Sequence, residues 1–123
     1  MNLKSKDYGL RAKDDFQILR QFQFHSSHMD ILNRLFTPLI GSSSTGLYIY
    51  LDQFSGQASQ SELTHYTIMS EVKINLLEFR KQMDVLEAIG LVKTYVHHDT
   101  AHSHFVYELI QPPTGKQFFD DPM

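Results

Sequence analysis

The chain of 123 residues contains no cysteine and no tryptophan, and it has only four prolines and six glycines. Without cysteine it can form neither a disulfide bond nor a thiolate metal site. Its apolar runs are far shorter than the ~20 residues of a membrane-spanning helix, and its N-terminus lacks the apolar core of a signal peptide. With 41% hydrophobic residues, the expectation is one cytoplasmic domain of ordinary composition.

Basic charge is scarce in the central part of the chain. The net charge is −3, but residues 1–27 carry five basic and three acidic groups, whereas residues 28–110 carry five basic and nine acidic groups. DNA binding depends on Lys and Arg side chains that displace counterions from phosphates. An acidic central part therefore starts at a disadvantage as a DNA-binding surface.

Hydrophobic periodicity and capping residues predict four helices, over about residues 27–40, 42–55, 61–72 and 75–89. Ser27 is the expected cap of the first helix, and Ser61 or Thr64 begins the third. Asn75 and Glu78 form a capping box that opens the fourth helix. The apolar stripe of the third helix is expected to be Leu63, Tyr66, Met69 and Val72, and that of the fourth Leu76, Phe79, Met83 and Leu86.

After Gly90, two alternating stretches predict a β-hairpin with strands at Leu91–Val96 and Phe105–Ile110. A loop at His98–Ala101, with His97 opposite His102, separates an apolar from a polar face. The apolar face then consists of Val92, Thr94, Val96, Ser103, Phe105, Tyr107 and Leu109. Helices followed by a hairpin indicate an α+β fold, mainly α with a small β-hairpin, of the winged helix-turn-helix type.

The winged helix is assigned to residues 28–110, with an N-terminal arm at 1–27 and a C-terminal link at 111–123. Within the arm, Phe16–Phe24 alternates apolar and polar residues, which is typical of an extended segment with one buried face. Two Phe residues stand next to an abrupt end at Met123, and this favours a fragment of a longer protein.

Several stretches resemble a known family. Leu32–Leu51 (LNRLFTPLIGSSSTGLYIYL) is similar to the segment LxxLYxPLIGxxAxxLY of the replication initiation and membrane attachment protein of Gram-positive bacteria. That family is called DnaB there and is unrelated to the helicase of the same name. Leu63–Val96, Phe105–Pro113 and Phe118–Met123 match the same family in order.

The resemblance implies a winged-helix domain for self-association and partner contacts, with no catalytic residue and no cofactor. It further implies that a whole protein of this family acts with a DnaD-type initiation protein and a loader ATPase to place the replicative helicase on DNA. Most DNA binding would reside in C-terminal domains absent from this chain. Membrane association would be peripheral and through partners.

The fourth helix stands where a recognition helix would lie. Its outward residues carry two positive and three negative charges. Base-reading helices rely on Arg, Lys, Asn and Gln. A solvated helix face is therefore favoured over a DNA contact, which remains the alternative reading, that of a stand-alone DNA-binding regulator. The candidate DNA-contact residues are Lys73, Asn75, Arg80, Lys81 and Lys93.

Aromatic and aliphatic residues of the arm and the second helix are candidates for a contact between subunits, because aromatic residues are enriched in interface cores. The candidate self-association residues are Phe16, Ile18, Phe22, Phe24, Tyr48 and Tyr50. Their alternative place is the core of the domain itself.

The remaining patterns indicate no chemistry. His97, His102 and His104 share one face of the predicted hairpin, but a polar, solvated wing is favoured over a zinc site. The sequence has no glycine-rich phosphate loop and no cysteine nucleophile. Neither a metal nor an enzymatic activity is predicted.

Overall fold

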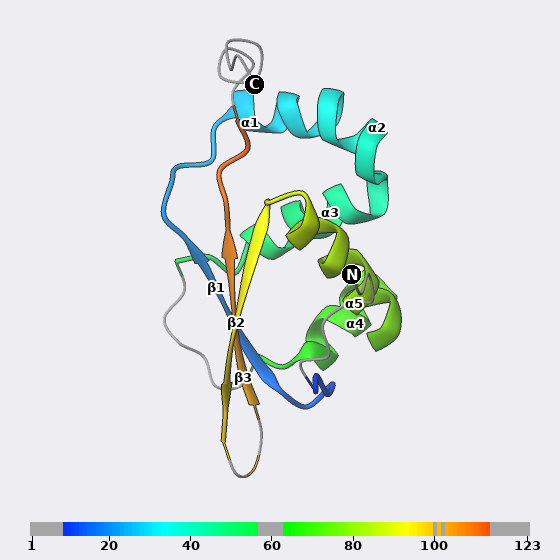
Figure 1. Ribbon diagram of the computed structural model, residues 1–123, viewed down its shortest axis with the longest axis vertical. Helices are drawn as coiled ribbons and strands as arrows, with labels where there is room; N and C mark the ends of the chain where they lie inside the picture. The colour runs from blue at the N-terminus through cyan, green and yellow to red at the C-terminus, as the bar shows by residue number, and fades with distance from the viewer. Residues whose placement is uncertain (1–8, 57–62, 100, 102, 114–123) are drawn as a thin grey trace, which may run out of the picture.

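The computed structural model describes residues 9–56, 63–99, 101 and 103–113. Along these residues the elements are β1 (Asp15–Arg20), α1 (Ser26–Ile31), the π-helix η1 (Leu32–Phe36), α2 (Thr37–Ile40), α3 (Ser42–Asp52), α4 (His65–Val72), α5 (Leu76–Ala88), β2 (Val92–His98) and β3 (Ser103–Leu109). Helices α3, α4 and α5 lie on one side of the strands, and α1 to α2 run across one end (Figure 1). The predicted α+β winged helix-turn-helix fold is confirmed, with α4 and α5 as the helix-turn-helix and β2–β3 as the wing.

The sheet of the described residues has three strands in the order β1-β3-β2. The hairpin is antiparallel and pairs His98 with Ser103 and His97 with His104. The predicted pairing of His97 with His102 is therefore wrong by two residues, and the loop begins at residue 99. Because side chains alternate with a period of two, a shift of two residues keeps both predicted faces. Accordingly, Ser103, Phe105, Tyr107 and Leu109 are buried as expected.

Strand β1 pairs in parallel with β3, so that Phe16 lies beside Phe105 and Ile18 beside Tyr107. The extended segment was predicted, but its partner strand was not. The backbone N–H of His65 donates to the carbonyl of Asp14 at 3.1 Å, which also joins β1 to the start of α4. These contacts correct the assignment of residues 15–20 to an arm outside the winged helix.

The C-terminal boundary of the domain also differs from the predicted one at residue 110. The backbone N–H of Ile110 donates to the carbonyl of Leu91 at 2.9 Å, and Pro112 is buried. Residues 111–113 thus pack on the domain instead of forming a separate link. The predicted arm residues 1–8 and link residues 114–123 lie outside the described part of the chain.

The first helix begins two residues earlier than predicted, because its cap is a different residue. His25, not Ser27, is the cap, and its backbone N–H donates to Nδ1 of His28 at 2.9 Å. The helix then continues through the wider turn of η1, where the N–H of Thr37 donates to the carbonyl of Leu32. Because Pro38 has no N–H to donate, the change of turn just before it lets the helix continue.

The helix-turn-helix follows the predicted capping pattern in part, since Thr64 makes no side-chain capping bond and Asn75 supplies one half of the predicted capping box. Thr64 precedes α4, while the other candidate cap, Ser61, lies outside the described residues. Asn75 Oδ1 accepts from the backbone N–H of Glu78 at 2.7 Å, which confirms Asn75 as the cap of α5. The predicted stripe of α4 is corrected, because Tyr66 is 60% exposed while His65 and Ile68 face the core.

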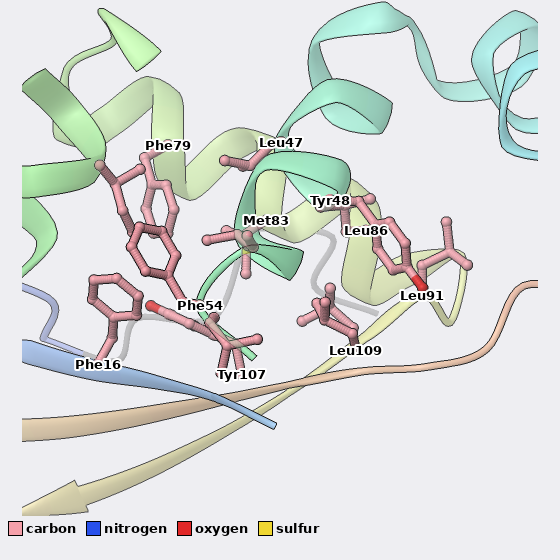
Figure 2. Close-up of a cluster of buried hydrophobic side chains, with 14 of the residues drawn as sticks. Phe16, Leu47, Tyr48, Phe54, Phe79, Met83, Leu86, Leu91, Tyr107 and Leu109 are labelled. Atoms are coloured by element: carbon pink, nitrogen blue, oxygen red, sulfur yellow. The ribbon is translucent and has the colours of Figure 1, made fainter. Parts of the chain in front are cut away.

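The core lies between the sheet and helices α3 to α5. Figure 2 shows Phe16, Phe54, Phe79 and Tyr107 gathered at one end of this core. The rings of Phe16 and Phe54 meet edge to face at 5.4 Å, a favoured arrangement of aromatic rings. At the other end, the hydroxyl of the fully buried Tyr48 donates to the carbonyl of Ile110 at 2.7 Å. This bond ties α3 to the segment after β3.

Candidate functional site

Helix α5 is in the position of a recognition helix, but its arginine, Arg80, forms ion pairs within the same helix. Arg80 contacts Asp84 at 2.9 Å and Glu87 at 2.7 Å, and only 11% of its side chain is exposed. Burial lowers the pKa of Arg80, but the hydrogen bond and charge of Glu87 raise it more, so the guanidinium stays charged. The assignment of Arg80 as a DNA contact is therefore corrected to a structural role.

The other candidate DNA contacts are more accessible. Lys73 ends α4 in a left-handed conformation (φ 66°), and Lys81 and Lys93 are exposed on α5 and β2. Asn75 is exposed too, but its side-chain oxygen is committed to the cap of α5. The exposed cations among the candidates are thus contributed one each by the end of α4, by α5 and by β2.

The outward ridge of α5 is largely apolar. Leu77, Lys81 and Val85 follow at intervals of four residues, and Leu77 is 71% and Val85 36% exposed. Residues four apart on a helix are neighbours on one face. A ridge with a leucine, a valine and one lysine resembles a protein contact surface more than a base-reading surface.

Three of the candidate self-association residues lie inside the domain. Phe16, Ile18 and Tyr48 are at most 3% exposed, which corrects their assignment to a contact between subunits. β1 pairs with β3 and places the first two on the inner face of the sheet. Tyr48 lies on the inner side of α3 (Figure 2). These side chains help to fill the small core, which was the alternative place predicted for them.

The remaining three candidates are half-buried. The rings of Phe22 and Phe24 lie 6.0 Å apart, and each meets His28 edge to face, at 5.4 Å and 5.7 Å. Tyr50 Oη donates to Glu71 of α4. His28 was not predicted as a site residue, although its spacing of three from His25 was the available signal. Burial, and to a smaller extent the charge of His25, lowers the pKa of His28.

A second histidine that was not predicted as a site residue is fully buried. His65 Nδ1 donates to the backbone carbonyl of Asp14 at 2.8 Å, so Nε2 accepts from Tyr107 Oη at 2.7 Å. Burial lowers the pKa of His65 to about 4, although Asp14 raises it in part. A neutral imidazole therefore joins α4, β1 and β3. Its contacts are structural, since both ring nitrogens are occupied by protein groups.

Two histidines of the predicted face, His97 and His104, lie opposite each other on β2 and β3. His104 Nδ1 lies 2.8 Å from Asp15 Oδ1, and His98 bonds the hydroxyl of Ser103 at 2.7 Å. His102, the third member of the predicted face, lies outside the described residues. Over the ranges that the structure describes, no three His, Asp or Glu side chains are grouped to hold a metal, and no helix is long and apolar enough to cross a membrane.

Comparison with known proteins places this geometry in a family. Residues 10–123 match the family model of the DnaB N-terminal winged helix domain. The chain is 50% identical over 125 residues to the replicative helicase loading/DNA remodeling protein DnaB of Staphylococcus aureus (strain NCTC 8325 / PS 47). All of this chain takes part in that match, which spans 27% of the relative's length.

A solved structure agrees with this assignment. The crystal structure of primosome protein DnaB (residues 1–300) from Geobacillus stearothermophilus superposes with a TM-score of 0.83 at 32% sequence identity. The match covers 93% of this chain and 44% of that one. The family model spans nearly the whole chain, and the fold agrees with it. The chain therefore belongs to the family of DnaB N-terminal winged helix domains.

Proposed function

We propose that this winged helix is an assembly and partner-docking domain of a bacterial protein that initiates and restarts DNA replication and helps to load the replicative helicase. The names of the relatives from S. aureus and G. stearothermophilus, a helicase loading protein and a primosome protein, support this role. The proposed location is the cytoplasm, with peripheral membrane association through partners. The domain itself acts without catalysis or cofactor.

The observation that carries the proposal is the surface of α5. The helix that would read bases has its arginine held by Asp84 and Glu87, and its most exposed large apolar side chain is Leu77. Phosphate contacts need accessible cations, and the neighbouring carboxylates repel phosphates. An apolar ridge at this place supports contact with another protein.

Self-association is the assembly part of the proposal, and Phe22, Phe24 and Tyr50 are its candidate residues. They are half-buried aromatic side chains, and the first two lie together next to α1. Burying them against a second subunit would join several copies of the protein. Linked copies raise the effective concentration of weak contacts to DNA and to the helicase. In this scheme the DnaD-type protein, the loader ATPase and the helicase are the partners, and DNA is bound mainly by domains outside this chain.

Sedimentation velocity at micromolar concentration, with and without a labelled oligonucleotide at about 50 mM salt, tests self-association and distinguishes the proposal from DNA binding. We expect a defined oligomer that leaves the oligonucleotide free. Phe22→Asp and Phe24→Asp should each give a folded species of lower mass, whereas Tyr66→Asp, which changes an exposed aromatic residue elsewhere, should keep the mass. An unchanged mass in both Phe variants would reject this interface.

The competing function is that of a stand-alone DNA-binding regulator, and the exposure of Lys73, Lys81 and Lys93 is the observation in its favour. It predicts that the oligonucleotide co-sediments with the protein and is released when salt is raised. Lys81→Glu combined with Lys93→Glu should then abolish binding. Wild-type protein that binds no oligonucleotide at low salt would exclude this function.

A further inference from the structure

A pocket of about 150 Å³ lies where α3, α4 and α5 meet. Its residues are Ser43, Leu47, Val72, Ile74, Glu78 and Gln82. Half of this lining is aliphatic, and among the described residues that line the pocket Glu78 is the one with an ionisable side chain. An engineered protein cavity of about this size accepts a benzene molecule, so the pocket has room for one side chain.

The carboxylate of Glu78 is held in place by a short chain of hydrogen bonds. Gln82 Nε2 donates to Glu78 Oε2 at 2.5 Å, and the hydroxyl of the buried Ser44 donates to Gln82 Oε1. Both ends of the Gln82 amide are therefore occupied, which fixes its orientation. Among the described residues no donor bonds the other carboxylate oxygen of Glu78, Oε1.

In the part of the chain that the structure describes, Glu78 is contacted by a neutral amide and not by a cation. Asp52 pairs with Arg20 at 2.6 Å, and Asp84 and Glu87 pair with Arg80, but no ion pair joins Glu78 to any residue that the structure describes. Lys81, one turn further along α5, makes none with it either. A half-buried carboxylate whose described donor is a neutral amide can still pair with a cation that arrives from outside.

We propose that this pocket binds a lysine or arginine side chain of a partner protein, with the cation on Glu78 and the aliphatic stem against Leu47, Val72 and Ile74. Lys and Arg combine an apolar stem with a charged head and so match both parts of the pocket. A purely aliphatic side chain would cover the carboxylate without pairing it. The net charge of −4 over residues 28–110 also favours a basic segment. The inference rests on the proposed function of the domain as a docking unit.

Amide NMR titration of the chain tests the proposal with three probes of similar size. These are the N-acetyl methylamides of arginine, lysine and norleucine, of which norleucine has the apolar stem without the charge. The matched variants are Glu78→Gln, which keeps an acceptor for Gln82, and Glu71→Gln. Glu71 is an exposed carboxylate of α4 that also accepts from a neutral donor, Tyr50, and does not line the pocket.

We expect the arginine and lysine probes to shift the amides of Ser43, Ile74, Glu78 and Gln82, and the norleucine probe to shift them less. Affinity for the basic probes should fall at least about fivefold in Glu78→Gln and stay unchanged in Glu71→Gln. It should also weaken as salt is raised. The spectra of the two variants report directly whether they are folded.

Three results would overturn the assignment: no shift at the pocket, equal affinity of wild type and Glu78→Gln, or equal affinity for the norleucine probe. The proposed function fails separately. If the basic probes bind but the domain does not oligomerise in sedimentation, the pocket stands and the assembly role falls. If sedimentation shows the expected oligomer and the probes do not bind, the domain docks its partner through another surface.

Discussion

The buried imidazole of His65 makes the stability of the fold depend on pH in a defined window. Burial lowers the pKa of His65 from 6.5 in the unfolded chain to about 4 in the folded domain, where its nitrogens bond Asp14 and Tyr107. Between these values the unfolded chain binds one proton more than the folded domain. The free energy of unfolding is therefore complete above about pH 6.5 and falls as the pH is lowered toward 4.

The size of the effect follows from the shift. Each pKa unit corresponds to about 1.36 kcal/mol, so the domain should lose about 2 kcal/mol by pH 5 and about 3 kcal/mol near pH 4 through His65 alone. Stabilities of 5–15 kcal/mol are usual for domains. The loss is thus a large part of the total and lies well within the range of urea unfolding.

The assay compares wild type with His65→Gln by urea unfolding at about pH 7.5 and pH 5. Gln can donate to Asp14 and accept from Tyr107 but does not titrate. Wild type should lose about 2 kcal/mol more than the variant over this range, because all other groups are shared. A direct NMR titration of the wild-type imidazole complements this comparison and does not depend on the variant folding. Equal losses in the two proteins, or an imidazole that titrates near 6.5 in the folded domain, would refute the reasoning.

Three further predictions concern α5, and urea unfolding checks each of them. Asn75→Ala removes the acceptor for the N–H of Glu78 and should cost about 1 kcal/mol; Asn33→Ala in the exposed part of η1 is its control, and equal losses would contradict the capping role. Met83→Ala leaves a hole in the fully buried core and should cost about 2–5 kcal/mol, so a loss below 1 kcal/mol would contradict the packing. Leu77→Glu changes a side chain that is 71% exposed and should shift stability by no more than about 0.5 kcal/mol, unless the ridge of α5 is covered in the free protein.

The parts of the fold that sequence reasoning predicted are those with local signals. The cap of α5 was visible as Asn75 followed by Glu78, and the apolar face of α5 as Phe79, Met83 and Leu86. The faces of the hairpin were predicted correctly even though the pairing of His97 was not. Side chains alternate between the two faces with a period of two, so a shift of two residues in the pairing leaves each residue on its predicted face. The sequence of the short loop did not determine at which residue the loop begins.

The sequence indicated the candidate site residues, but it did not determine which of them are exposed and which are buried. Lys81 and Lys93 are exposed as a DNA or protein surface requires, but Arg80 is not, because two carboxylates within one helix hold it. The spacing of Arg80, Asp84 and Glu87 was present in the sequence. Whether such residues pair with each other or face solvent depends on how the sheet covers that flank of the helix.

By itself, the sequence determined the helices, the wing and the winged-helix order, because periodicity, caps and turns act between residues close together in the chain. Only the tertiary structure decided that β1 adds to β3 in parallel, that His65 bridges Asp14 and Tyr107, and that Glu78 lies at a pocket. These features join residues far apart in sequence. The packing of the whole chain decides which partner a strand, an imidazole or a carboxylate contacts. Local sequence patterns do not carry this information.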